Sequence, residues 1–271
     1  EVVAQVPFAT LEEVDHAVAN AKQAFKSWRK VSLAKRQQFL LTFLQLARAN
    51  TTHIAELITL EHGKTLPDAE GEVGRGIEAI ENACMVTKLQ LGELADNVAG
   101  NVNVYTLNKP LGVGVGITAF NFPIMLPCFM FPIAIACGNT FVLKPSEQDP
   151  TSTMFLAKLA YEAGLPPGVL NVVHGGADVA NHLAEHEDVK ALSFIGSTHV
   201  GSSLYRRASN AGIRAQCMMG AKNHCVIMPD ANKGQAINHL LGSCFGAAGQ
   251  RCMANSVAIL VGETKHWLPE I

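Results

Sequence analysis

The chain contains few charged residues for its size, and it lacks the runs of basic residues that attract nucleic acids. Of its 271 residues, 16% are charged, and the formal net charge is −2. It contains no basic run and no RNA-binding signature, so we expect no nucleic-acid partner. None of the seven cysteines forms a CxxC pair, which indicates a reducing compartment and no zinc ribbon. We therefore expect no structural metal.

One stretch lacks charge altogether, from Leu111 to Leu143. It is long enough to span a bilayer. However, three prolines interrupt it, and glycine and asparagine residues punctuate it near both ends. These residues divide it into a strand, a helix and a second strand, so we predict a buried strand–helix–strand unit and no membrane span.

The first hundred residues have the pattern of helices. Thr10 and Glu13 form a capping box before an amphipathic run that ends near Trp28. Capping and stop signals then predict a helix from Ser32 to Ala49, one from Thr52 to Gly63, and a long one from Pro67 to about Glu93. The alternating segment 101–109 predicts an exposed strand.

After Pro110, short apolar strands alternate with helical stretches, which is typical of an α/β fold with a parallel sheet and helices on both faces. The expected strands are 113–118, 140–144, 169–173, 191–195, 215–219, 225–228 and 256–261. The expected helices are 123–137, 150–163, 177–185 and 198–211.

Two turns of this sheet are candidate nucleotide-binding segments, although the GxGxxG fingerprint is absent. In FIGST (194–198) a strand ends, Gly196 turns the chain, and Ser197 opens a helix whose N–H groups could receive a phosphate. In LKPSE (143–147), Lys144 and Glu147 could hydrogen-bond a ribose diol, or could be ordinary loop charges.

Two histidine patterns suggest metal binding only weakly. HLAEH (182–186) fits the HxxEH zinc pattern, but no clear segment for a third ligand follows it. We expect a solvated helix face there. His224 has no companions at ligand spacing, so we expect a hydrogen-bonded core or loop histidine.

The stretch GAAGQRC (246–252) places Cys252 after a turn of small residues and beside Arg251. A neighbouring cation favours the thiolate, which is the reactive form of cysteine. The local sequence alone leaves two interpretations open, a nucleophile and a buried small apolar residue.

Four motifs in this order, FNFP (120–123), LKPSE, FIGST and GQRC (249–252), resemble the aldehyde dehydrogenase superfamily. Segments 56–73, 120–147, 219–232 and 245–254 look like its CoA-acylating branch, the methylmalonate-semialdehyde dehydrogenases. The resemblance covers the whole chain. It implies an aldehyde-dehydrogenase-like, Rossmann-type fold with an N-terminal helical segment and the start of a second α/β domain.

The resemblance also implies roles for particular residues. Cys252 would be the nucleophile, and the Asn121 amide with the Cys252 N–H would stabilise the oxyanion. The residues expected to bind NAD are Ala119, Phe120, Lys144, Glu147, Gly196 and Ser197. Arg75 and Arg251 would bind a substrate carboxylate, although without the resemblance Arg75 would be expected to pair with Glu72 or Glu78.

The resemblance further implies which acceptor takes the acyl group. Met218 stands where hydrolytic members carry a glutamate base, and a thioether cannot accept a proton from water. The implied reaction is NAD-dependent oxidation of methylmalonate or malonate semialdehyde, with decarboxylation and acyl transfer to coenzyme A. The alternatives are a hydrolytic aldehyde dehydrogenase and a truncated fragment without catalytic activity.

We predict an NAD-binding domain over residues 1–219, in which 97–110 contributes a strand to an oligomerisation hairpin, and the start of a catalytic domain over 220–271. Because family members are much longer, we expect this segment alone to be inactive. The full-length enzyme would form a dimer or tetramer without a membrane partner. Its compartment would be the cytoplasm in a bacterium and the mitochondrial matrix in a eukaryote.

Overall fold

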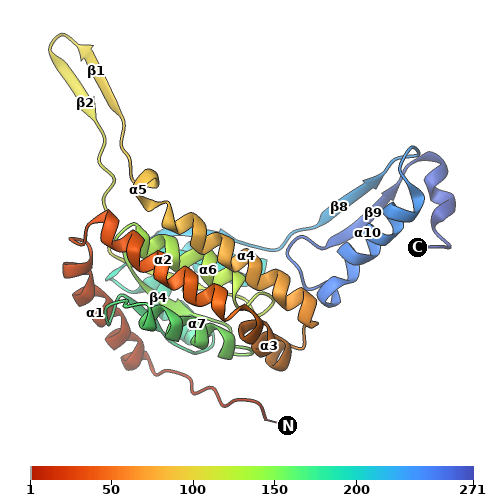
Figure 1. Cartoon of the computed structure of the whole chain (residues 1–271), viewed down its shortest axis with the longest axis horizontal. Helices are drawn as coiled ribbons and strands as arrows, with labels where there is room; N and C mark the ends of the chain where they lie inside the picture. Colours follow the sequence, from red (N-terminus) through yellow and green to blue (C-terminus); the bar gives the residue numbers. More distant parts are fainter. Residues whose placement is uncertain (1) are drawn as a thin grey trace. The chain divides into compact units, whose positions relative to one another are not determined.

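The computed structural model describes residues 2–271, which divide into two units, 2–218 and 219–271 (Figure 1). The helices of the first unit are α1 (Leu11–Trp28), α2 (Leu33–Ala49), α3 (Thr51–His62), α4 (Leu66–Cys84), α5 (Val86–Leu89), α6 (Met125–Ala136), α7 (Thr151–Glu162), α8 (Ala177–Glu185) and α9 (Thr198–Asn210). Its strands are β1 (Leu94–Ala99), β2 (Val102–Tyr105), β3 (Val113–Ile117), β4 (Thr140–Lys144), β5 (Leu170–Val172), β6 (Val189–Ile195) and β7 (Arg214–Met218).

A five-stranded parallel sheet forms the centre of the first unit, in the order β5-β4-β3-β6-β7. From β3 the chain proceeds outward through α6 to β4 and through α7 to β5. It then returns through α8 to β6, which pairs with the other side of β3. The direction of winding therefore reverses between β3 and β6, and ligands of such sheets bind beyond the carboxyl ends of the strands at this point.

Alternating residues of the strands supply two separate apolar cores, one on each face of the sheet. Phe141 and Leu143 of β4 belong to a core with α2, α3, α4, α6 and α7. Val142, between them, belongs to a second core with α1, α8 and α9. This arrangement confirms the predicted parallel sheet with helices on both faces, and the uncharged stretch forms β3, α6 and β4 as predicted. Among the residues that the structure describes, no helix is both long and apolar enough to cross a membrane.

The N-terminal helices begin where the sequence predicts. Thr10 and Glu13 form the capping box of α1, and the Ser32 hydroxyl accepts the Lys35 N–H at the start of α2. One boundary was predicted wrongly, because α4 ends at Cys84 instead of near Glu93. The Gln37 side chain of α2 donates to the Cys84 carbonyl at 2.7 Å and satisfies that helix end, a tertiary contact that local sequence does not reveal.

After α5 the chain forms an antiparallel hairpin of β1 and β2, which Figure 1 shows extending away from the rest of the first unit. Both strands are exposed along their whole length. The sequence predicted β2 but not its partner β1.

The second unit contains a parallel pair of strands, β8 (Asn223–Ile227) and β9 (Asn255–Leu260). Between them lie the helix α10 (Lys233–Phe245), which the sequence analysis missed, and the short 3-10 helix η1 (Gly246–Gly249). A second 3-10 helix, η2 (Gly262–Trp267), follows β9.

Candidate active site

The loop after β3 carries Ala119, Phe120 and Asn121, and it lies at the reversal point of the sheet. Ala119 and Ile195, the last residue of the neighbouring strand β6, both pack against the small cluster of Phe122, Met125 and Leu126. The structure therefore brings the FNFP loop and the FIGST turn side by side, at the sheet edge where doubly wound folds bind ligands.

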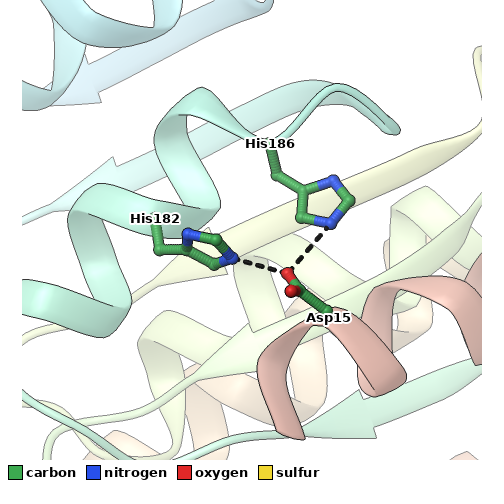
Figure 2. Close-up of side chains that lie close together, drawn as sticks. All are labelled: Asp15, His182 and His186. Carbon is green, nitrogen blue, oxygen red and sulfur yellow. Dashed lines mark hydrogen bonds and ion pairs between the residues drawn. The ribbon is translucent and has the colours of Figure 1, made fainter. Parts of the chain in front are cut away.

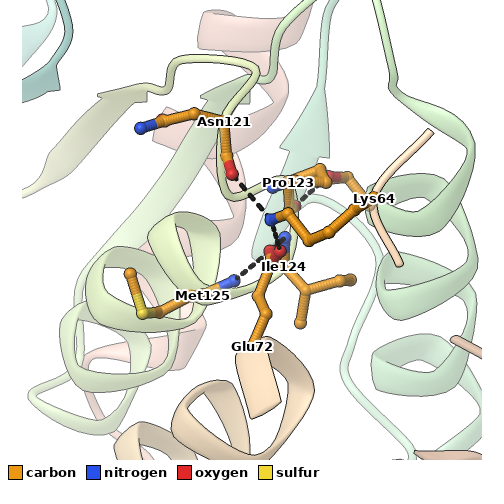
Figure 3. A network of polar contacts seen from close by, with 7 residues as sticks. Lys64, Glu72, Asn121, Pro123, Ile124 and Met125 are labelled. Atoms are coloured by element: carbon orange, nitrogen blue, oxygen red, sulfur yellow. Dashed lines mark hydrogen bonds and ion pairs between the residues drawn. The ribbon is translucent and has the colours of Figure 1, made fainter. Parts of the chain in front are cut away.

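A buried ion pair lies directly beneath the FNFP loop (Figure 3). The Lys64 Nζ lies 2.5 Å from Glu72 Oε2, and the two side chains are 2% and 0% exposed. Lys64 also donates to the Asn121 carbonyl at 2.8 Å. The other Glu72 oxygen accepts the N–H groups of Ile124 and Met125.

Sequence reasoning missed this pair, although it left a signal. The buried positions of α4 are Ala69, Glu72, Val73, Gly76, Ile80, Ala83 and Cys84. A glutamate on an otherwise apolar helix stripe needs a buried partner. Gly76 allows the necessary approach of α4 to α6, because a Cβ there would lie 3.1 Å from the Ile124 side chain.

Arg75, a predicted carboxylate ligand, also lies at this loop. Its guanidinium carbon is 5.6 Å from the centre of the Phe122 ring, one residue from Asn121. The alternative pairing of Arg75 with Glu72 does not occur, because Glu72 is fully buried and binds Lys64. Phe120 stacks on His62, and burial followed by the charge of Lys64 lowers the pKa of that imidazole.

Lys144 and Glu147 meet in the loop after β4, with Lys144 Nζ 3.1 Å from Glu147 Oε2. Partial burial raises the pKa of the Glu147 carboxyl, but its own backbone N–H and Lys144 outweigh this and hold it below its usual value. The lysine is buried and the carboxylate is partly exposed. An ionised, accessible carboxylate suits ribose hydroxyls and would repel a 2′-phosphate.

The FIGST turn has the geometry expected of a helix start. Ser197 is the N-cap of α9, and its hydroxyl accepts the Val200 N–H. Gly196 has a packing role, because a Cβ there would lie 2.5 Å from the Phe194 ring. The first turn of α9 offers backbone N–H groups and the positive end of a helix dipole, which fits an anionic pyrophosphate. These features fit NAD, whose nicotinamide accepts a hydride when it is bound.

Cys252 lies in the second unit and is exposed. The turn before it is strained, since Ala247 and Ala248 have φ values of 50° and 54°, followed by Gly249 at 73°. Non-glycine residues rarely adopt this conformation, and it is concentrated at functional sites. The Arg251 guanidinium folds back over Gly246, where a Cβ would lie 2.5 Å from its Nη1 atom.

Asn223 holds the segment that follows Cys252. Its Nδ2 donates to the carbonyls of Cys252 and Ala254 at 2.9 and 3.0 Å. This asparagine was not predicted, because no local motif distinguishes it.

Met218, in the first unit, ends β7 with an exposed side chain. His224 is hydrogen-bonded as expected, with its Nδ1 2.8 Å from the Lys222 carbonyl, but it is an exposed residue of strand β8 and not a core or loop histidine.

The HxxEH histidines do not form a solvated helix face, and that prediction was wrong. His182 and His186 both meet Asp15 of α1, through Nε2 atoms 2.5 and 3.3 Å from its Oδ1 (Figure 2). The three side chains offer a possible metal ligand set, whose third member the sequence did not reveal. However, the Asp188 N–H donates to His186 Nδ1, which places the proton of the neutral ring on Nε2, facing Asp15. The second nitrogen of a metal-bound imidazole usually donates a hydrogen bond, whereas Nδ1 of His186 accepts one. This geometry therefore favours hydrogen bonds from the histidines to the Asp15 carboxylate, a carboxylate clamp, over a metal site.

The reversal of strand order, with the loops after β3, β4 and β6 at one edge, defines the doubly wound, Rossmann-type class of α/β proteins. Comparison with known proteins then identifies the family. The model of the aldehyde dehydrogenase family matches residues 1–266, and the chain belongs to this family.

Relatives from several organisms are similar over the whole chain. The chain is 53% identical over 271 residues to the mitochondrial acylating methylmalonate-semialdehyde/malonate-semialdehyde dehydrogenase of Mus musculus, covering 100% of this chain and 51% of the relative. A crystal structure of methylmalonate-semialdehyde dehydrogenase from Oceanimonas doudoroffii superposes with a TM-score of 0.95 at 46% identity, covering 98% of this chain and 54% of that one.

A second crystal structure was determined with NAD. This protein of Sinorhizobium meliloti 1021, assigned as a methylmalonate-semialdehyde dehydrogenase, gives a TM-score of 0.96 at 44% identity, covering 100% of this chain and 55% of that one. The chain thus spans about half the length of the curated relatives it matches.

Proposed function

We propose that this chain belongs to an enzyme that catalyses the NAD-dependent, CoA-acylating oxidation of methylmalonate or malonate semialdehyde. The observation that carries the proposal is the pairing, at the reversal point, of the Asn121 loop with the Gly196–Ser197 helix start. An exposed Cys252 on a strained turn supplies the nucleophile. The names of the relatives and the NAD complex support the substrate and the cofactor.

Each residue has a defined task in this proposal. The Cys252 thiolate attacks the aldehyde carbon, and the carbonyl π electrons move to oxygen, which the Asn121 amide stabilises. NAD⁺, which Lys144, Glu147, Gly196 and Ser197 would hold, would supply the hydride acceptor, so that the thiohemiacetal on Cys252 becomes a thioester. The substrate carboxylate is released as CO₂, and a proton replaces it on the adjacent carbon. The CoA thiolate then attacks the thioester, which yields propionyl-CoA or acetyl-CoA and regenerates the cysteine thiolate.

The two arginines and Met218 select substrate and acceptor. Arg75 and Arg251 carry the charge that a substrate carboxylate requires. Because Met218 cannot activate water, the thioester persists until CoA, whose thiolate needs no such base, removes it. We further propose that the enzyme acts as a homo-oligomer through the β1–β2 hairpin. A eukaryotic source would place it in the mitochondrial matrix, as the names of the mammalian relatives suggest, and a bacterial source in the cytoplasm.

The decisive experiment uses the protein expressed from its complete gene. Malonate semialdehyde and NAD⁺ without CoA should give a burst of one NADH per active site, and CoA should restore turnover with acetyl-CoA as the product. Cys252→Ala should abolish the burst. Steady turnover to a free acid without CoA would instead establish the hydrolytic reaction. NAD⁺ binding in calorimetry without any burst would establish a non-catalytic protein.

A further inference from the structure

The backbone of the polypeptide that carries Asn121 is fixed by buried side chains from other elements. Lys64 donates to the Asn121 carbonyl, the Thr153 hydroxyl donates to the Pro123 carbonyl at 2.6 Å, and Glu72 accepts two N–H groups at the start of α6. Figure 3 shows the Asn121 carbonyl directed toward Lys64 and its side chain extending away from the ion pair. Four backbone atoms within five residues are thus held by three buried side chains.

The Glu72 carboxylate serves as the cap of α6. The N-cap residue Ile124 supplies no side-chain hydrogen bond, so the first N–H groups of this helix depend on a group from elsewhere. A carboxylate at this end also interacts favourably with the helix dipole. Glu72 comes from α4, so the position of α6 relative to α4 sets the position of the loop.

A buried ion pair is an expensive way to stabilise a fold. Apolar residues of similar volume often stabilise a protein as much or more, while loss of one partner leaves an unpaired buried charge. Lys64 and Glu72 have a further use, because each binds both its partner and the backbone of the loop. The Lys64 ammonium also lies 4.3 Å from the centre of the Phe122 ring, the residue after Asn121. The pair is therefore specific for one loop conformation.

We propose that Lys64 and Glu72 are positioning residues that hold the Asn121 amide where the oxyanion develops. This inference rests on the proposed function. A displacement of the amide by a fraction of an ångström weakens a hydrogen bond that counts most in the transition state, so the rate of the chemical step should fall while NAD⁺ affinity is retained.

The test compares burst rates of NADH formation in the protein expressed from its complete gene. The double variant Lys64→Met/Glu72→Gln removes both charges together and keeps an oxygen for the α6 N–H groups. We expect its burst rate to fall about 10- to 100-fold, with the Kd for NAD⁺ in calorimetry unchanged. The single variant Lys64→Arg keeps the positive charge and the Glu72 partner, so its burst rate should lie between those of the double variant and the wild-type protein.

The same substitutions in an Asn121→Ala background separate positioning from general damage. If the pair acts through Asn121, the double substitution should have almost no further effect on the burst rate there. Trp28→Phe is the matched control, because Trp28 donates to the Ile135 carbonyl at the far end of α6. It should lower the Tm without changing the burst rate.

A third variant covers the case in which the double variant does not fold. Thr153→Val removes the hydrogen bond from an uncharged side chain to the Pro123 carbonyl. It should slow the burst several-fold in the wild-type background and have almost no effect in the Asn121→Ala background. Equal slowing with and without Asn121 would overturn the positioning role while leaving the proposed function intact. A wild-type protein without any burst would overturn the proposed function and this inference together.

Discussion

His182 Nε2 lies 2.5 Å from Asp15 Oδ1, and this contact joins α8 to α1 across 167 residues of sequence. His186 adds a second imidazole to the same carboxylate oxygen. A second bridge between the same regions runs from Lys22 of α1 to Asp188. The HxxEH pattern therefore contributes to the packing of α1 against α8 and the turn before β6.

This clamp predicts a pH-dependent contribution to stability. The His182 hydrogen bond lowers the pKa of the Asp15 carboxyl, against a smaller opposing effect of burial. A carboxyl with a lowered pKa stabilises the fold above its unfolded pKa, and the contribution is lost as the pH falls through the folded value. Asp15→Asn should therefore cost about 0.5–1 kcal/mol near pH 6 and progressively less as the pH falls below the unfolded pKa of 3.8. The cost is small because the pair is partly exposed. Thermal unfolding over this pH range measures the effect, with Asp96→Asn on the exposed β1 as the control.

The buried carboxyl of Asp149 should show the opposite dependence. Burial raises its pKa to about 7, Ser146 opposes this, and the charges of Glu61 and Glu72 raise it further. Between the unfolded pKa of 3.8 and the folded value, the unfolded chain ionises and the folded chain stays protonated, so stability falls as the pH rises. Asp149→Asn escapes this loss.

Accordingly, the gain in the free energy of unfolding from Asp149→Asn should grow from pH 4 to pH 7 and then level off, with an upper limit of about 4 kcal/mol. Thermal unfolding at each pH measures this gain. Asp178→Asn, in the first turn of α8, provides a comparison at the surface. A gain that is the same at pH 4 and pH 7 would contradict the protonation of Asp149.

The left-handed turn before Cys252 predicts that glycine is tolerated better than alanine. Ala248 has φ 54° and ψ 30°, a conformation that costs an alanine about 1 kcal/mol relative to glycine. Ala248→Gly should therefore stabilise the 246–252 segment by about that amount, seen as slower hydrogen exchange. Ala236→Gly in the regular helix α10 should destabilise by a similar amount. Faster exchange in Ala248→Gly would show that the turn is unstrained.

Glu147 should control the choice between NAD and NADP. Glu147→Gln keeps the size of the side chain and removes the negative charge that would repel a 2′-phosphate. We expect kcat/KM for NADP⁺ to rise about tenfold relative to that for NAD⁺, which corresponds to roughly 1.4 kcal/mol. Glu162→Gln, at a surface pair with Lys158, should leave the ratio unchanged.

Local patterns were sufficient for most elements of this protein. The capping box of α1, the span of α8 and the alternation of apolar strands with helices identified the α/β fold, because capping, periodicity and turn residues act over a few positions. The motifs that point to NAD binding and a cysteine nucleophile are local in the same sense. The end of α4 and the partner strand β1 were missed, since their boundaries depend on contacts with distant segments.

The sequence by itself determined the fold class and the family, and it indicated the residues that we propose bear the chemistry. Only the tertiary structure decided which polar groups meet: the buried Lys64 with Glu72 beneath the Asn121 loop, and the partly exposed Asp15 with two histidines. The physical reason is that a buried charge requires a partner, but its choice of partner depends on how helices pack across the sheet. No spacing along the chain encodes that packing.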